Sequence, residues 1–373
     1  MKVLFPFVGD SVGGSHNSII ELHKELTNNN VHSIILVHRK GPLSSYLDSI
    51  GIKYSYLSMH NFAGESPNFL SILYNILINF NKISKYIKKN KFSIVHGNDL
   101  RINLTWSLPT KLSKASYVWH QRTIMSPSLM WRVTHFLSDY FIAISNVVYK
   151  SLPSNVPECK KYMLLNPFDI GSIFNKFDSK YIIRLRYSIP HNSFIMGYVG
   201  RLVDWKNVDF LIKCFSKYSK KRKNIYLLIV GTGKDEYVSL LKKQVQLLGI
   251  ETIVIFAGFS SKVNEIIAGL DIMVAPSNQE PFGRTLVESM IQKTPVLAAM
   301  GGGHLEIIEN GVTGRLYEHE NIDNFIVQVD AFFFNNKLTK GIVEQAYINA
   351  INLYSSSKHF NNIMPIYKQL NNV

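Results

Sequence analysis

The sequence is poor in cysteine and has no long apolar run, and each absence excludes a class of protein. Cys159 and Cys214 are the only cysteines in 373 residues, which excludes a disulfide framework and a cysteine-rich zinc site. So few cysteines fit a reducing cytoplasm. The apolar run at residues 1–8 ends before signal-peptide length, and no stretch approaches the ~18 apolar residues of a membrane-spanning helix. We therefore expect a cytoplasmic protein that is neither secreted nor integral to a membrane.

Acidic residues are scarce relative to basic ones. The chain holds 41 Lys and Arg against 26 Asp and Glu, a formal net charge of +15 at pH 7. The excess lies in the first half: residues 1–190 carry 22 basic and 10 acidic side chains, and residues 191–373 carry 19 and 16. This imbalance predicts an anionic partner: nucleic acid, acidic lipid or a phosphorylated substrate. Because the basic residues are not interleaved with aromatic ones, we expect no nucleic acid partner.

Short apolar runs alternate with helical patterns along the whole chain, and hydrophobic residues make up 46% of it. This alternation predicts an α/β fold of βαβ units, with parallel sheets covered on both faces. The ten expected strands are residues 2–8, 33–37, 94–96, 117–119, 140–144, 194–199, 225–230, 253–256, 272–275 and 295–298. Ten strands exceed one compact Rossmann sheet, so we expect two doubly wound domains facing each other across a cleft. A TIM barrel is the structural alternative, but glycine-rich strand–helix junctions cluster at two separate places.

One helical pattern has two interpretations. Its apolar residues recur at helical spacing and are followed by basic ones: Phe69, Ile72, Leu73, Ile76, Phe80 and Ile83, then Lys82, Lys85, Lys88, Lys89 and Lys91. The first interpretation is a core-facing helix whose terminal lysines complement its dipole. The second is a basic amphipathic surface for anionic lipid. The first is the usual arrangement in α/β domains and is the one expected here, and the basic first half keeps the second open.

Glycine-rich junctions follow several of the expected strands. Gly13 and Gly14 come after the first strand, where they allow a tight turn and direct helix amides toward an anion. The full dinucleotide fingerprint is missing, so an ordinary strand–helix turn is the alternative. Gly231 and Gly233 follow another strand and suit a loop that contacts phosphate or base. The remaining Walker residues are missing there, which argues against a P-loop NTPase.

Charged residues gather after two strands of the second half. Arg201 and Lys206 follow the strand that ends at Gly200, and a guanidinium with an ammonium suits a diphosphate. Two solvated cations on a loop are the alternative. In the segment 275–290, Gly283 permits a tight turn into a helix whose first amides would bind an anion. Glu280 and Glu288 flank that turn, so they could line one pocket, although Arg284 and Glu288 could equally form a surface pair at i,i+4.

The sequence resembles the retaining GT-B glycosyltransferases of family 4. The resemblance is carried by the order of Arg201, Lys206, the segment 280–283 and Glu288 along the chain. The mark of these enzymes is two glutamates separated by seven residues. The resemblance covers residues 194–320 strongly and the whole chain loosely. It implies a GT-B fold with an N-terminal acceptor-binding Rossmann-like domain over residues 1–168. A nucleotide-sugar-binding Rossmann-like domain would follow over 169–354, and a helix over 355–373 would cross back to the first domain.

The resemblance also implies roles for individual residues. The implied catalytic residues are His120, Arg201, Lys206 and Glu280. The implied donor-binding residues are Gly14, Gly200, Gly233, Phe282, Gly283, Arg284, Thr285 and Glu288. Arg201 and Lys206 would stabilise the leaving diphosphate, Glu288 would hold the ribose hydroxyls, and Glu280 would contact the donor sugar.

Three further positions concern the acceptor side. His120 matches the family histidine near the donor sugar and acceptor, and its alternative is a strand-end histidine bonded to backbone. His16 and Asn166 are the weaker acceptor-side candidates. Asn166 resembles the first residue of an Asn-Gly-Val-Asp turn, but Pro167 and Phe168 replace its Gly and Val.

The function implied is retaining, metal-independent transfer of a sugar from a nucleotide-diphosphate sugar to a glycan or lipid-linked acceptor. No Asp-x-Asp motif is present to hold a metal against the diphosphate, so no metal or other cofactor is expected. The expected context is the biosynthesis of bacterial surface polysaccharides such as O-antigen, capsule or lipopolysaccharide. The expected partner besides the substrates is an anionic membrane surface. The expected location is the cytoplasm, with peripheral binding at the inner face of the plasma membrane as an option. The alternatives are a GT-B-like nucleotide-sugar epimerase and a non-catalytic basic binding module.

Overall fold

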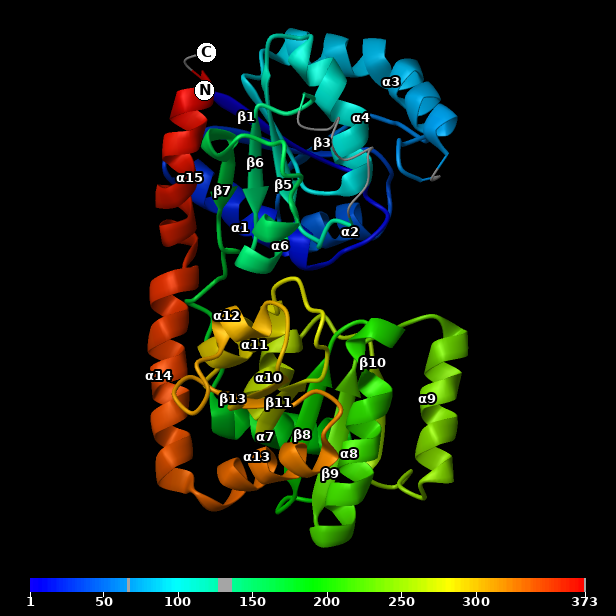
Figure 1. The fold of residues 1–373 in the computed structure, drawn as a ribbon, viewed down its shortest axis with the longest axis vertical. Coiled ribbons are helices and arrows are strands. Elements are labelled where there is room, and N and C mark those ends of the chain that lie inside the picture. Colours follow the sequence, from blue (N-terminus) through cyan, green and yellow to red (C-terminus); the bar gives the residue numbers. More distant parts are fainter. Residues whose placement is uncertain (66–67, 127–135, 372–373) are drawn as a thin grey trace. The chain divides into compact units, whose positions relative to one another are not determined.

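The computed structural model describes residues 1–65, 68–126 and 136–371, and the chain divides into two compact units (Figure 1). Unit 1 comprises Met1–Asp169 and Tyr354–Val373, and unit 2 comprises Ile170–Leu353. These bounds lie one residue from the predicted limits at 168 and 354. Each unit is a parallel sheet with helices on both of its faces, so the predicted pair of doubly wound Rossmann-like domains is confirmed.

Unit 1 is built on a sheet in which the first strand is central. Its described strands are β1 (Lys2–Phe7), β2 (His32–Val37), β3 (Tyr54–Tyr56), β4 (Ile94–Gly97), β5 (Ser116–Gln121), β6 (Tyr140–Ala143) and β7 (Lys161–Met163). They lie in the order β3-β2-β1-β4-β5-β6-β7, and every pair is parallel. Both faces of the central strands β1 and β5 are buried, which is why β1 is apolar from Val3 to Phe7 without alternation.

The helices of unit 1 include one that comes from the far end of the sequence. The described helices are α1 (Gly14–Asn28), α2 (Pro42–Ser49), α3 (Phe69–Asn90), α4 (Leu100–Lys111), α6 (Asn146–Ser151) and α15 (Ser356–Asn371). α15 contacts α1 and β4, and Figure 1 shows it beside α1. Its residues Ile363, Ile366 and Tyr367 are part of the same core as Val3 and Phe5 of β1. The predicted return of the last helix to the first domain is thus confirmed.

Unit 2 repeats this design with a second sheet. Its strands are β8 (Phe194–Val199), β9 (Ile225–Val230), β10 (Val254–Gly258), β11 (Ile272–Ala275), β12 (Val296–Ala299) and β13 (Arg315–Tyr317), in the order β10-β9-β8-β11-β12-β13. The helices are α7 (Lys176–Arg186), α8 (Val208–Lys221), α9 (Asp235–Leu247), α10 (Val263–Gly269), α11 (Arg284–Ile291), α12 (His304–Ile307), α13 (Ile322–Phe334) and α14 (Asn336–Tyr354). α8 buries Leu211, Phe215 and Tyr218 against this sheet, at the spacing of one helix face.

Each sheet has one place where the chain leaves neighbouring strands in opposite directions. In unit 1 this place lies between β1 and β4, and in unit 2 between β8 and β11. Ligands of open parallel sheets bind outside the carboxyl ends of the strands at such switch points. The two switch points therefore define where the candidate residues should be sought.

Each of the ten predicted strands has a counterpart, and within residues 1–65, 68–126 and 136–371 three short strands were missed. The missed strands are β3, β7 and β13, each of three residues and each at a sheet edge. Two of them, β3 and β7, have no fully buried residue, so they lack the apolar run by which the others were recognised.

None of the helices in the described residues has both the length and the apolar character that crossing a membrane requires.

We expect the stability of unit 1 to fall in acid because its histidine His38 is fully buried, with 0% of the residue exposed. Trp106 Nε1 donates to His38 Nε2 at 3.2 Å, and His38 Nδ1 lies 2.7 Å from the Leu57 carbonyl oxygen, so the neutral ring satisfies both partners. Burial lowers the pKa of His38 to about 4 from 6.5. Between these values the folded state binds fewer protons than the unfolded state, so stability is full above pH ~6.5 and is lost as the pH falls toward ~4.

Replacing His38 by Asn should therefore reduce the loss of unfolding free energy between pH 7 and pH 5 by about 2 kcal/mol. Urea unfolding at the two pH values measures this. The exposed His191 provides the control variant His191→Asn. An equal pH dependence in wild type and His38→Asn would contradict the assignment.

Candidate active site

The predicted donor residues of unit 2 lie in loops that leave its sheet at the switch point. Arg201 and Lys206 follow β8, and Glu280 and Gly283 follow β11, the neighbouring strand. Gly231 and Gly233 follow β9 on the other side of β8. Because parallel strands end at the same edge, residues spread over more than 80 positions of sequence gather there.

Lys206 is held between a carboxylate and an aromatic ring. Its Nζ forms an ion pair with Glu280 Oε2, and the two side chains are 19% and 14% exposed. The same Nζ lies 4.4 Å from the centroid of the Trp205 ring, and the Arg201 guanidinium lies 6.0 Å from it. Ser277 Oγ donates to the Trp205 carbonyl at 2.8 Å, which ties the loop after β8 to the loop after β11. The structure thus brings two of the predicted catalytic residues into direct contact.

Glycine is required in the loop after β9 because two backbones approach closely. A Cβ on Gly231 would lie 1.8 Å from the Gly200 carbonyl oxygen, and a Cβ on Gly233 would lie 1.9 Å from that of Leu202. Gly200 donates its amide to Val230 at 3.0 Å, and Leu202 donates to Thr232 at 2.8 Å. The predicted donor-binding glycines Gly200 and Gly233 therefore hold the Arg201 loop against the strand end.

A second glycine run supports the Glu280 loop. Gly302 has a φ of +51°, and a Cβ there would lie 2.4 Å from the Glu280 carbonyl oxygen. Gly303 donates its amide to the same oxygen at 2.7 Å, and a Cβ on Gly303 would lie 2.5 Å from the Phe282 carbonyl oxygen. His304 follows, nine-tenths buried, and burial lowers its pKa while the Glu280 charge opposes that shift. The segment 301–303 therefore fixes the backbone that carries Glu280.

α11 begins at Gly283 with a left-handed backbone, φ +107°, that glycine adopts without strain. The predicted residues Arg284 and Thr285 form its first turn, and Phe282 is buried just before it. Arg284 and Glu288 form the i,i+4 ion pair considered above, at 3.3 Å, with both side chains 17% exposed. The pair is therefore largely shielded from solvent. Glu288 lies on the second turn of α11, and the ion pair holds its carboxylate next to Arg284.

In unit 1 the predicted His16 lies on the first turn of α1, after β1. The Gly13 amide donates to His16 Nδ1 at 3.1 Å, so the ring proton is on Nε2. The ring packs on Phe7 with centroids 4.8 Å apart, and burial lowers its pKa to about 4. Gly14 opens the helix itself. His16 is thus a neutral hydrogen-bond donor at Nε2 around pH 7.

His120 is the penultimate residue of β5 and is 1% exposed. It is the last member of a chain of hydrogen bonds that begins at Tyr367 on α15. Tyr367 Oη lies 2.6 Å from His96 Nδ1, and His96 Nε2 lies 3.0 Å from His120 Nδ1. Arg122 Nη2 lies 3.2 Å from the same His120 Nδ1. The partners of His120 are thus side chains and not the backbone.

These contacts determine the tautomers. Arg122 can only donate, so His120 Nδ1 accepts and the proton of His120 is on Nε2. His96 Nε2 must then donate, and His96 Nδ1 accepts from the Tyr367 hydroxyl. Burial lowers the pKa of both histidines well below the usual value, and the Arg122 charge adds to this. Both rings are therefore neutral near pH 7.

The Nε2 of His120 is buried and has no hydrogen-bond partner among the described residues. A buried N–H left unpaired costs about 1–3 kcal/mol, and such groups call for an explanation. A ligand oxygen at the carboxyl end of β5 would satisfy it. The geometry therefore fits a hydrogen-bond donor at this position and does not fit a general base, because the lone pair of Nδ1 is already occupied.

Asn166, the other acceptor-side candidate, lies in the same neighbourhood as His120. Its Oδ1 accepts a hydrogen bond from Arg122 Nη1 and another from Ser18 Oγ at 3.1 Å. Asn98 Oδ1 accepts from Arg122 Nη2 at 2.6 Å. Arg122 thus joins Asn166, Asn98 and His120, the last two at the ends of β4 and β5. Sequence reasoning did not single out Arg122, although it stands two residues beyond His120 after a strand.

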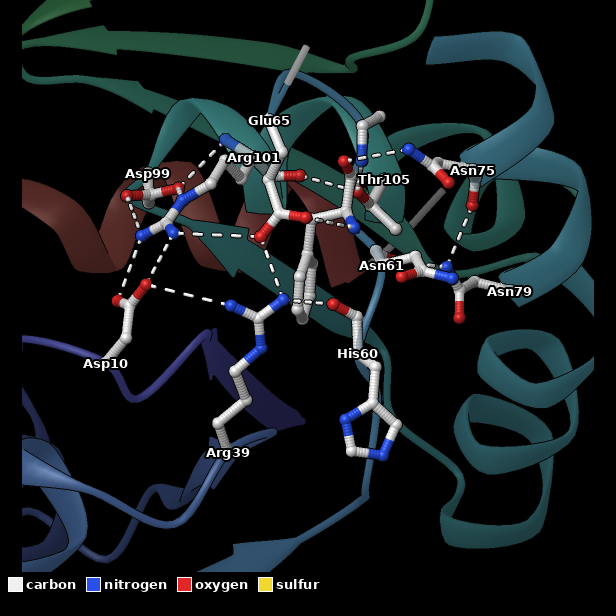
Figure 2. Close-up of polar contacts among 12 residues, drawn as sticks. Asp10, Arg39, His60, Asn61, Glu65, Asn75, Asn79, Asp99, Arg101 and Thr105 are labelled. Carbon is white, nitrogen blue, oxygen red and sulfur yellow. Dashed lines mark hydrogen bonds and ion pairs between the residues drawn. The ribbon is translucent and has the colours of Figure 1, made fainter. Parts of the chain in front are cut away.

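A network of charged side chains at the same edge was also missed (Figure 2). Arg101 Nη1 donates to Asp10 at 2.6 Å and its Nε to Asp99 at 3.2 Å, while Arg39 Nη2 lies 2.9 Å from Glu65 Oε1. The hydrogen bond from Arg101 lowers the pKa of Asp10, and Asp10 in turn raises that of Arg101. Asp10, Arg39 and Asp99 each follow a strand of unit 1, and that shared position is the signal that could have found them.

Comparisons with known proteins find similarity to glycosyltransferases. Residues 180–348, which make up most of unit 2, match the family model described as Glycosyl transferases group 1. An uncharacterized glycosyltransferase of Methanocaldococcus jannaschii, MJ1607, is 29% identical over 245 residues, 62% of each chain. The capsular polysaccharide biosynthesis glycosyltransferase CapM of Staphylococcus aureus is 24% identical over 232 residues, 61% of each chain. The chain thus spans less than two thirds of the length of either relative.

Solved structures show the same fold over nearly the whole chain. HepE of Anabaena, crystallised with UDP and glucose, has a TM-score of 0.86 at 21% identity and covers 99% of each chain. A glycosyltransferase from Rickettsia africae has a TM-score of 0.83 at 24% identity, covering 99% of this chain and 98% of that one. The predicted GT-B fold is therefore confirmed, and the predicted resemblance to group 1 glycosyltransferases is borne out by the match of residues 180–348. Membership of family 4 within this group stays a prediction, as do the roles of the individual residues.

Gly302→Ala tests whether the glycine run positions the Glu280 loop. We expect an added Cβ to displace that loop by ~1 Å and to lower kcat/KM by about 10²-fold. Gly311 also has a positive φ, +81°, but its Cβ would meet nothing within 4 Å. Gly311→Ala is therefore the control for left-handed backbone strain, which costs about 1 kcal/mol in either variant. Equal kinetic losses in the two variants would contradict this role of Gly302.

Tyr367→Phe tests the hydrogen-bond chain to His120. Without the hydroxyl, His96 Nδ1 loses its donor while His96 Nε2 still donates to His120. We therefore expect the Nδ1 resonance of His96 to shift in the nitrogen spectrum of the histidine side chains, with the tautomer unchanged. The transfer rate should fall by about fivefold, the equivalent of one hydrogen bond of ~1 kcal/mol. Tyr140→Phe, a buried tyrosine outside this chain, is the control. An unchanged Nδ1 resonance of His96 in Tyr367→Phe would contradict the hydrogen-bond chain.

Proposed function

We propose that this chain transfers a sugar, with retention of anomeric configuration, from a nucleotide-diphosphate sugar to a hydroxyl of a glycan or lipid-linked acceptor. The observation that carries the proposal is the gathering of Lys206, Glu280 and the glycine-lined loops at the switch point of unit 2. Cations, close-approaching backbone and a helix start at such a place suit a diphosphate. The match of residues 180–348 to the family model of group 1 glycosyl transferases also supports the proposal.

In this mechanism the cations bear the charge that develops on the leaving group. As the bond from the anomeric carbon to the diphosphate oxygen breaks, Arg201 and Lys206 stabilise the departing phosphate. The ion pair with Glu280 holds Lys206 in place beforehand, so little reorganisation is needed when the diphosphate arrives. Glu280 and Glu288 then accept hydrogen bonds from sugar and ribose hydroxyls.

The reaction proposed needs neither an enzymic nucleophile nor a metal ion. The acceptor oxygen bonds to the anomeric carbon from the face that the diphosphate leaves, and the leaving phosphate takes the proton of the acceptor hydroxyl. Arg201 and Lys206 supply the positive charge that a divalent cation supplies in other transferases. In this proposal His120 donates from Nε2 to a sugar oxygen, and His16 and Asn166 have roles in acceptor binding.

We further propose that the reaction belongs to bacterial surface polysaccharide assembly, in the cytoplasm at the inner face of the plasma membrane. The name of CapM, a capsular polysaccharide biosynthesis glycosyltransferase, supports this context. The basic excess of residues 1–190 suits a polyanionic or lipid-anchored acceptor.

The test begins with nucleotide binding in EDTA. Thermal unfolding with UDP, GDP, ADP and dTDP should show one preferred nucleotide, because a ligand at a hundredfold excess over Kd stabilises the folded state by about 2.7 kcal/mol. Arg201→Ala and Glu288→Ala should abolish the shift, and Lys220→Ala, an exposed cation at the end of α8, should retain it. The same nucleotide's sugar should then be transferred in EDTA, with the anomeric configuration of the product read by proton NMR.

Three results would contradict the proposal. These are the absence of any nucleotide shift, an inverted product, and conversion of the nucleotide sugar without acceptor, which would indicate an epimerase.

A further inference from the structure

α3 has two apolar faces, and the structure buries only one of them. Ile72, Ile76, Ile83 and Ile87 are at most 7% exposed and pack against unit 1. The other face is exposed to solvent: Leu70 by 71%, Leu73 by 42%, Tyr74 by 61%, Leu77 by 60% and Ile78 by 52%. The expectation of a simple core-facing helix is therefore only half correct. Of the residues assigned to the core stripe, Phe69 and Leu73 are in fact exposed.

The exposed apolar residues are followed by lysines on the same side of the helix. One line along the surface of the helix contains Leu70, Tyr74, Leu77, Lys85 and Lys88. Neighbouring residues on this line are three, four or eight positions apart in sequence, and each of these separations is close to a whole number of helical turns. Leu73 and Ile78 flank the apolar half of this line, and Lys89 flanks the basic half. We call these eight residues the α3 face. It is apolar over its first nine positions and basic over its last five.

Nothing acidic interrupts the α3 face. The sequence of α3 contains no Asp or Glu among its 22 residues. Lys85, Lys88 and Lys89 form no ion pair with any residue that the structure describes, whereas Lys82 donates to the Ser58 carbonyl and is left out of the face. Single exposed apolar residues are normal on protein surfaces, but five on one helix beside unpaired lysines mark an interaction surface.

We propose that the α3 face docks unit 1 on an anionic lipid bilayer. The apolar half enters the boundary between headgroups and acyl chains, and Lys85, Lys88 and Lys89 bind the lipid phosphates. The combination of large apolar side chains with lysines is typical of helices that lie in a membrane interface. Lysines near an anionic surface strengthen binding by about fivefold each, so the three together contribute about 10²-fold.

Charge decides against a second copy of the chain as the occupant. Two α3 faces brought together would place their lysines in one interface, in a protein whose net charge is +15. Like charges across an interface are unfavourable, whereas an anionic bilayer complements them. The inference rests on the proposed function in one respect: binding to the bilayer would bring the enzyme to a lipid-linked acceptor. The binding itself requires neither donor nor acceptor.

The experiment measures vesicle binding in the absence of nucleotide and acceptor. The wild-type protein should sediment with vesicles of phosphatidylglycerol and phosphatidylcholine and much less with phosphatidylcholine alone, and added salt should weaken the binding. Leu73→Ser/Leu77→Ser should lower the affinity at least about tenfold, and Lys85→Gln/Lys88→Gln/Lys89→Gln about 10²-fold. Tyr74→Trp should show a blue shift of its fluorescence on binding, because the indole leaves water.

A matched control is available in unit 2. Leu240 and Leu247 of α9 are 63% and 79% exposed and lie beside Lys242 and Lys243. Leu240→Ser/Leu247→Ser should bind vesicles like the wild type. All substitutions are at exposed positions, and circular dichroism confirms that each variant is folded.

Two results would overturn the inference: equal binding to neutral and anionic vesicles, or α3 variants that bind like the control. A wild-type dimer in light scattering that Leu73→Ser/Leu77→Ser converts to monomer would assign the face to a second copy instead. Sugar transfer to a water-soluble acceptor separates the two proposals. The α3 variants should retain that activity, and its absence in the wild type as well would count against the proposed function and not against the lipid surface.

Discussion

Parallel pairing of the strands is the constraint on which the rest of this structure depends. In a parallel sheet all strands end at one edge, so every strand delivers the residues after it to the same side. Because β1 and β8 are central and the chain moves first to one side and then to the other, each sheet has one point where adjacent loops diverge. The contact of Lys206 with Glu280, 74 residues apart, follows from this strand order.

The sequence was most informative where burial leaves a pattern. Ten strands were located from their short apolar runs. β3, β7 and β13 were missed because each has only three residues, too few for such a run, and β3 and β7 also have no fully buried residue. The loop residues of unit 2 were found for a different reason. Their residue types are dictated by close backbone approach at Gly231 and by charge at Arg201, and both leave local signals.

Contacts that depend on distant partners left no such signal. His96 and Tyr367 are 271 residues apart, and neither looks unusual in its own segment. The tautomer of His120 follows from Arg122, and that tautomer in turn orients His96 and Tyr367. The sequence could therefore place His120 at a strand end without showing what its ring can do. The exposed side of α3 is a related case. Periodicity identifies an apolar helix, but it cannot say which of two apolar faces the rest of the domain covers.

The membership of α15 in unit 1 has a consequence for how the protein is made. Ile363, Ile366 and Tyr367 fill the core beneath β1 and β4, yet they leave the ribosome only after all of unit 2. During synthesis the sheet of unit 1 therefore stays open on that side while a complete unit 2 is being produced. Unit 2, whose residues are continuous in sequence, can close its core first. The nascent chain thus folds its second half ahead of its first, and the unfinished core of unit 1 is the surface that chaperones would meet.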